Sequence, residues 1–164
     1  MAIMLPGEVS YLLNMLGFEW PEGNEDKIFA YAGDWMAYAA AVDGPRGTAA
    51  SAAEHATANN TGPALQAFAA ELDQPEGVKE VAEQLAMAGN VAGGVLLLVG
   101  ALVIALKIAF VVNLVLLAIQ IAQAVAAAAA TFGASLAWIP IARVICARLL
   151  EFALNMVVEK LMAG

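Results

Sequence analysis

The chain has 164 residues, a length that fits one domain with a substantial core. Hydrophobic residues make up 62% of it and charged residues 13%, whereas an average globular domain is about half apolar and about a quarter charged. A small monomer cannot easily hide this much apolar surface, so we expect a partner chain, a second copy or lipid to cover part of it. Cys146 is the only cysteine, which excludes an intrachain disulfide and leaves the redox compartment open.

Charge divides the chain into two halves. Residues 1–84 contain 13 acidic and three basic side chains, a net charge of −10, and residues 85–164 contain two acidic and four basic ones, a net charge of +2. An acidic half argues against nucleic-acid binding, which needs a basic surface, and against adhesion of that half to anionic lipid. We expect this half to be a solvated face or a docking surface for a basic partner.

A short first helix is expected near the N-terminus. Pro6 suits the first turn of a helix that Gly17 ends, and the Trp-Pro-Glu-Gly sequence at 20–23 predicts a turn. Phe18 and Trp20 are expected to seal the end of a helical bundle. The opening residues have no basic segment and no small-residue cleavage site, so they do not resemble a general secretory signal peptide.

A long helix is expected from Asn24 onward. Asn24 suits the N-cap position, and Glu25 and Asp26 follow it where the helix dipole favours anions. Five further residues recur at steps of four and three, which places them on one face and predicts a seam against another helix. The Gly-Pro-Arg-Gly sequence at 44–47 is expected to weaken or break this helix. The seam residues are Ile28, Ala32, Trp35, Ala39 and Val42.

The second helix of a hairpin is expected after the Asn-Asn-Thr-Gly-Pro sequence at 59–63, which is a strong turn signal. Pro75 and Gly77 should interrupt this helix before it resumes toward residue 90. Together with the first long helix it predicts an antiparallel hairpin over 24–90. The residues expected to pack on the seam are Leu65, Phe68, Leu72, Val81 and Leu85.

Beyond the hairpin the chain is almost uncharged. Lys107 is the only charged residue in the stretch 84–142. A continuous helix over 78–130 would be about 80 Å long. A break is expected at 131–133, followed by a last helix over 134–162.

The apolar half fits two environments. Residues 85–106 and 108–130 are each long enough to cross a bilayer, but Lys107 between them and three amide side chains among residues 113–123 oppose insertion into lipid. The Gly-x-x-x-Gly spacing at 89–93 suits close helix packing in lipid and in a soluble bundle alike. We favour a soluble-capable bundle, and membrane association stays open.

The expected fold is all-α. It is an elongated helical bundle built on an antiparallel helical hairpin, with a long apolar helix and a C-terminal helix that packs back. One domain, 1–164, is expected, with a short helix and turn at 1–23, the hairpin at 24–90, the long apolar region at 91–131 and the last helix at 134–162.

No catalytic, cofactor-binding or metal site is expected. His55 is the only histidine and lies beside Glu54 in a polar stretch, so a metal site would lack further ligands. Cys146 has no histidine near it in sequence to act as a base. The glycines at 89–94 lack the strand and the Lys-Ser/Thr ending of a phosphate loop. We therefore expect a protein that is not an enzyme and takes no small-molecule substrate.

Several motifs resemble a known family. The motifs are Leu5-Pro6-Gly7-Glu8, Leu12-Leu13-Asn14, Gly17, Trp20-Pro21, Asn24-Glu25-Asp26-Lys27 and the late Ala-Thr-Phe-Gly at 130–133. With these motifs the chain is similar to the N-terminal domain of CpnT-like channel-toxins, which is related to the Trp-x-Gly helical-hairpin proteins of type VII secretion.

Two departures from the family pattern matter. The Trp-x-Gly turn falls at Asn60-Thr61-Gly62, so Asn60 replaces the tryptophan that normally adds apolar surface for a partner helix. The export signal Tyr-x-x-x-Asp/Glu is also missing, because the fourth residues after Tyr11, Tyr31 and Tyr38 are Met, Trp and Val. A partner would have to supply this signal.

The resemblance implies a trafficking module. We expect the N-terminal docking part of a type VII-secreted polymorphic toxin, which binds a co-secreted helical partner or itself, engages the type VII machinery and reaches the cell surface or the medium by a non-classical route. No toxin domain is expected in these 164 residues, so the sequence is either a fragment or a stand-alone copy. The alternative is an integral-membrane or pore-forming protein that uses residues 85–130.

Overall fold

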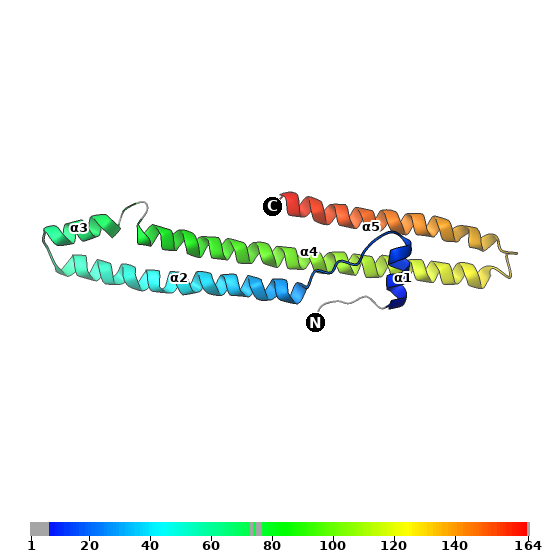
Figure 1. The fold of residues 1–164 in the computed structure, drawn as a ribbon, viewed down its shortest axis with the longest axis horizontal. Coiled ribbons are helices and arrows are strands. Elements are labelled where there is room, and N and C mark those ends of the chain that lie inside the picture. Colours follow the sequence, from blue (N-terminus) through cyan, green and yellow to red (C-terminus); the bar gives the residue numbers. More distant parts are fainter. Residues whose placement is uncertain (1–6, 73, 75–76, 164) are drawn as a thin grey trace. The chain divides into compact units, whose positions relative to one another are not determined.

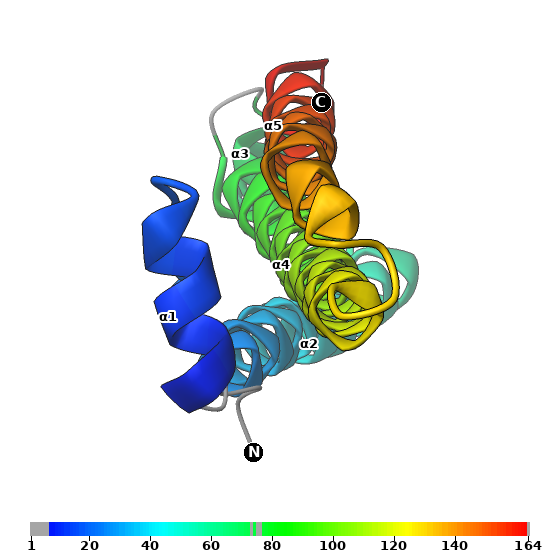
Figure 2. The same cartoon turned by 90° about the vertical axis from the view of Figure 1, so that its right-hand side faces the viewer.

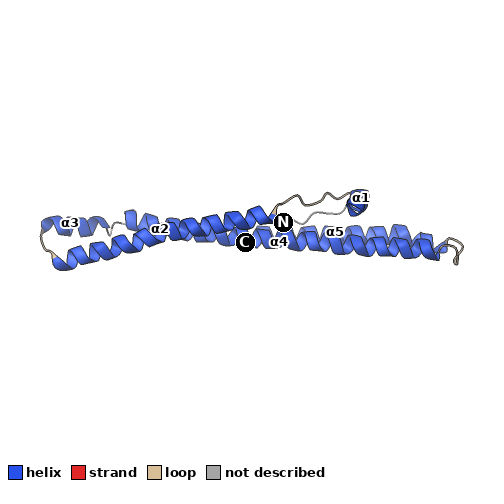
Figure 3. Ribbon diagram, turned by 90° about the horizontal axis from the view of Figure 1, so that it is seen from below, coloured by secondary structure: helices blue, strands red, loops and turns tan. Residues whose placement is uncertain are grey.

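The computed structural model describes residues 7–72, 74 and 77–163. Within these residues helix is the only regular secondary structure, which confirms the all-α fold (Figure 3). The elements in chain order are α1 (Gly7–Met15), α2 (Glu25–Asn59), α3 (Pro63–Leu72), α4 (Val78–Ala127), the short 3-10 helix η1 (Ala134–Ala137) and α5 (Trp138–Ala163) (Figure 1).

The chain forms two compact units. We call Lys27–Leu98 the hairpin unit, and we call Met1–Asp26 together with Val99–Gly164 the terminal unit. Helix α4 runs from one unit into the other. A single domain over 1–164 stays a prediction.

Most predicted helix ends are confirmed. α1 ends before Gly17, whose φ of 81° lies in the left-handed region that favours glycine. α3 and α4 are separate helices on the two sides of the predicted interruption, and α4 is continuous over 50 residues. The predicted break after α4 is confirmed by positive φ values at Phe132 and Gly133.

The expected weakening or break at 44–47 does not take the form of a break, because α2 is continuous with Pro45 inside it. Pro45 removes one backbone donor, but the surrounding side chains are mostly exposed, so water can satisfy the freed carbonyl. Arg46 also fixes this stretch: its guanidinium pairs with Asp43 at 2.8 Å and with Glu83 of α4 at 3.1 Å. α2 therefore continues through the local breaker signal, with one ion pair inside the helix and one to α4 beside it.

Small residues bring α2 and α4 together in the hairpin unit. A Cβ atom added at Gly89 would lie 3.0 Å from the Ala39 Cβ and 3.1 Å from the Trp35 carbonyl oxygen. One added at Gly93 would lie 2.7 Å from the Met36 Cγ. The Gly-x-x-x-Gly face of α4 thus packs on α2, and the two helices run antiparallel.

The terminal unit has an apolar core between α1, α4 and α5. α5 runs antiparallel to the second part of α4: the Ser135 hydroxyl, just before α5, donates to the Ala124 carbonyl at 2.7 Å, and the Cys146 thiol lies 3.6 Å from the Asn113 carbonyl. α1 lies across α4 rather than along it (Figure 2). The core residues are Leu13, Leu106, Phe110, Leu114, Leu117, Ala142, Cys146 and Leu150.

Phe18 and Trp20 pack against this core. Their rings meet Phe110 edge-on, with centroid distances of 6.2 and 6.4 Å. They cover the side of α4 at Phe110, an interior position of that helix, and not the end of a bundle as expected.

A buried ion pair joins the start of α2 to α4. The Lys107 ammonium lies 2.6 Å from the Glu25 carboxylate and donates to the Gly23 carbonyl oxygen at 2.7 Å. It also lies over the Trp20 ring, 5.8 Å from its centroid. The side chains of Lys107 and Glu25 are only 2% and 5% exposed. The single charge of the apolar stretch is thus neutralised inside the protein.

Much of α4 remains uncovered. Among the described residues it is the one helix long and apolar enough to cross a membrane, and only 22% of its most apolar stretch is buried. α5 also exposes apolar side chains, among them Trp138, Ile145 and Phe152. The expectation of surplus apolar surface is therefore met in both helices.

Candidate functional site

The predicted seam on α2 divides into small buried members and larger exposed ones. Ala32 and Ala39 are fully buried where α2 meets the glycines of α4. Ile28 and Val42 are half-buried, and Trp35 is 46% exposed. Trp35 is therefore not a core residue, although it lies between two buried alanines along the helix.

Trp35 instead lines an apolar groove. Tyr31, Trp35 and Tyr38 follow one another along α2, and the Trp35 and Tyr38 rings meet edge-on at a centroid distance of 6.0 Å. The groove has a volume of about 570 Å³. We call it the aromatic groove, and its lining residues are Tyr31, Asp34, Trp35, Tyr38, Leu85, Ala88 and Gly89.

The residues predicted on the opposite helix do not form one buried face. Leu65 and Leu72 of α3 are half-buried, whereas Phe68 is 43% exposed. Val81 and Leu85 of α4 are exposed as well, and Leu85 lines the aromatic groove. The close contact with the first part of α2 comes from the glycines of α4 and not from these larger side chains.

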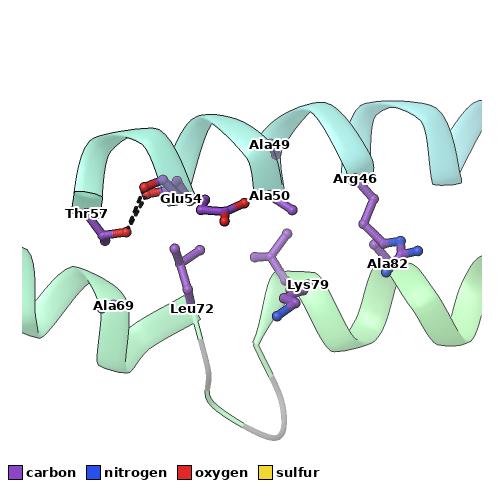
Figure 4. A pocket seen from close by; sticks show the side chains of 11 residues that line it. Arg46, Ala49, Ala50, Glu54, Thr57, Ala69, Leu72, Lys79 and Ala82 are labelled. Carbon is purple, nitrogen blue, oxygen red and sulfur yellow. Dashed lines mark hydrogen bonds between the residues drawn. The ribbon is translucent and has the colours of Figure 1, made fainter. Parts of the chain in front are cut away.

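A second pocket lies where α3 ends and α4 begins (Figure 4). It measures about 410 Å³, and Leu72 points into it from α3 toward the alanines of α2. Arg46 at one end is held by its ion pairs with Asp43 and Glu83. At the other end the Thr57 hydroxyl donates to the Glu54 carbonyl at 3.0 Å. The lining combines alanine methyl groups with the side chains of Leu72 and Val78 and with the polar groups of Arg46, Glu54, Thr57 and Lys79.

The turn residues close the hairpin by hydrogen bonding. The Asn60 side-chain amide donates to the Ala56 carbonyl at 3.0 Å, which caps the end of α2. Gly62 has a φ of 140°, a backbone conformation that side chains disfavour, and its carbonyl accepts from Gln66 at 3.1 Å. Asn60 thus supplies a helix cap at the end of α2.

The two residues considered for metal binding or catalysis are His55 and Cys146. His55 is exposed on α2, where its ring Nδ1 lies 3.3 Å from the Asn59 amide. Cys146 is buried in the core, and this burial raises the pKa of its thiol. In the described part of the chain, no three His, Cys, Asp or Glu side chains gather in a way that could hold a metal ion.

The sequence indicates two features of the structure only in part. The Gly-x-x-x-Gly spacing at 89–93 predicts close helix packing, but it does not identify α2 as the helix that packs there. Lys107 stood out as the lone charge in an apolar stretch, but its partner Glu25 lies 82 residues away. Spacing along one helix cannot identify such a partner.

Comparison with known families gives a match over most of the chain. A family model described as WXG100 like domain matches residues 4–149, which is most of the chain. Neither the curated proteins nor the solved structures include a match. The match agrees with the hairpin of α2, α3 and α4 around the turn at Asn60 and Gly62. The chain is therefore a member of the WXG100-like domain family, helical proteins associated with type VII secretion.

Proposed function

We propose that this chain is a non-enzymatic docking and trafficking module for type VII secretion, the N-terminal part of a polymorphic toxin of the CpnT-like kind. The observation that supports it most is the family match over residues 4–149. The opening motifs shared with CpnT-like channel-toxins favour this branch of the family.

The exposed apolar surface supports a role in binding. In the hairpin unit, Trp35, Tyr38 and Leu85 are all more than 40% exposed. Aromatic and aliphatic side chains gathered in a groove are typical of protein interfaces. A helical partner would remove them from water and would supply the Tyr-x-x-x-Asp/Glu export signal that this chain lacks.

Secretion of a reporter fusion tests the proposal. The chain, fused at its C-terminus to a reporter enzyme, is produced together with a helical-hairpin protein that carries the Tyr-x-x-x-Asp/Glu export signal. The host is type VII-competent, with the secretion ATPase either active or inactivated. We expect the reporter in the medium only when the ATPase is active. Retention in the cytosol in both strains, or release in both, would contradict the proposal.

A second candidate function is membrane association through α4. The specific observation is that α4 is long and apolar enough to cross a bilayer while most of its apolar stretch is uncovered. Burial of Lys107 by Glu25 also removes the charge that lipid would penalise most. Extraction of membranes with alkaline carbonate separates the two functions: an integral protein stays in the pellet, and a docking module is released.

A further inference from the structure

The three aromatic residues of the groove form one continuous stripe. Tyr31, Trp35 and Tyr38 are spaced by four and three residues, which places them on one face of α2. Leu85 of α4 forms the opposite wall. The edge-on contact between the Trp35 and Tyr38 rings restricts both side chains before anything binds. A groove of this kind suits the apolar ridge of a helix.

Gly89 makes the groove possible. Its missing side chain lets α4 approach the Trp35 backbone, and an added Cβ atom would lie 3.3 Å from the Tyr38 ring. The groove is therefore lined on the α4 side by Leu85 and the small residues Ala88 and Gly89, and on the α2 side by the aromatic residues. The groove is preformed, which reduces the entropy lost on binding.

Charge selects the occupant. Asp34 is exposed and lines the groove. The hairpin unit as a whole contains eight acidic and three basic side chains, a net charge of −5. A second copy of the same face would bring two such charges together, and an anionic lipid surface would be repelled as well. A helix with basic residues beside its apolar ridge meets no such repulsion.

The turn offers no competing aromatic anchor. At the hairpin turn, the Asn60 amide is occupied in capping α2. From these observations we propose that the partner anchor of this chain is the aromatic groove and not the hairpin turn. Its occupant is an amphipathic helix with an apolar ridge and a basic flank. This inference rests on the docking function proposed above and specifies where and what the module binds.

Two synthetic helical peptides test the assignment. They share one leucine ridge and differ only in their flanks, which are lysine in one and glutamate in the other. We expect the lysine peptide to bind the full chain in calorimetry at least about tenfold more tightly than the glutamate peptide. Trp35→Ala should weaken lysine-peptide binding at least about tenfold, the size typical of a tryptophan hot spot.

Two further variants complete the peptide test. Asp34→Lys should reduce or invert the preference between the two peptides. Phe152→Ala, which removes an exposed aromatic ring from α5, should leave binding unchanged. Because Trp35 is nearly half exposed, Trp35→Ala should keep the helical circular dichroism spectrum of the wild type. No binding of the lysine peptide, equal binding of both peptides, or unchanged binding by Trp35→Ala would each overturn the proposal.

The secretion assay separates this proposal from the function on which it rests. If the wild-type fusion is not exported, the docking function fails. If the wild type is exported and Trp35→Ala is exported equally well, the function stands and the groove is not the anchor. We expect Trp35→Ala to abolish most of the export, and Asn60→Ala to retain it.

Discussion

The Lys107 ammonium lies in the least polar part of the chain and still has three partners. The Glu25 carboxylate, the Gly23 carbonyl and the Trp20 ring surround it, and all three come from the segment that precedes or begins α2. Taking a lysine and a glutamate out of water is costly, and the pair is tolerated only because its hydrogen bonds are made. The pair therefore specifies which part of the chain lies at this position of α4.

Glu25→Gln tests this pair. The substitution leaves the Lys107 charge buried without its carboxylate, so we expect a loss of about 3–5 kcal/mol in the free energy of unfolding. The double variant Glu25→Gln, Lys107→Met removes the uncompensated charge and should recover most of this loss. Urea denaturation followed by circular dichroism measures both. A loss below about 1 kcal/mol in the single variant would show that the pair is not needed.

Cys146 should be an unreactive thiol. Burial raises its pKa, so the thiolate that reacts with disulfide reagents is scarcer at pH 8 than in an unfolded chain, and the rate should rise as the pH is increased. Ellman's reagent should label the native protein far more slowly than the protein in guanidinium. In a Cys146→Ala background, Ser51→Cys on the exposed face of α2 gives the control for an accessible thiol. Equal labelling rates of Cys146 and this control would contradict the buried position.

At the scale of elements, α2 and α4 associate through their smallest residues. The sequence predicted the helices and most of their ends, because proline, glycine and asparagine mark the turns. It did not predict that Ala32, Ala39, Gly89 and Gly93 would form the contact while Trp35 stayed outside. Hydrophobic spacing identifies a face of a helix, but it does not distinguish a face buried by close backbone approach from one that binds a partner.

Adjacent glycines on α4 give a matched test of this contact. Gly93→Ala places a methyl group 2.7 Å from the Met36 Cγ and 3.0 Å from the Ala32 carbonyl oxygen, and it should destabilise the protein by about 1–3 kcal/mol. Gly94→Ala meets open space and should stabilise the helix by about 0.5–1 kcal/mol. Thermal denaturation of both variants checks the signs. Equal effects of the two substitutions would contradict the packing of Gly93 on α2.

Pro45 shows why a local breaker can fail. The lost hydrogen bond of a helix-interior proline is a local cost, and the Arg46–Asp43 pair is local to α2 as well, whereas the Arg46–Glu83 pair forms only once α2 lies beside α4. A sequence window around residue 45 contains Pro45, Asp43 and Arg46 but not Glu83.

At the scale of the whole molecule, the chain has few charged residues and many exposed apolar side chains. The charged fraction is 13%, and large hydrophobic residues are exposed on α2, α4 and α5. Composition alone predicted this excess. Which face of each helix would remain uncovered depended on pairings between distant segments, so the aromatic groove could not be located from the sequence.

The purified chain without a partner should therefore associate with itself or with a hydrophobic dye. We expect strong binding of anilinonaphthalene sulfonate and sedimentation above the monomer mass, both reduced by a mild detergent, because exposed apolar patches favour association. A monomer that binds no dye would contradict the exposure of α4 and α5.

The terminal unit is assembled from both ends of the chain. Glu25 and Lys107 are 82 residues apart, whereas the hairpin unit is one continuous segment, Lys27–Leu98. During synthesis the ribosome releases residues 27–98 before Lys107 and Phe110, so the hairpin can close while Trp20 and Glu25 still lack these partners. Contacts over such long loops also close more slowly than local ones. The newly made protein should thus present the aromatic groove before the buried ion pair of Lys107 with Glu25 forms. A partner present during translation would meet the hairpin first.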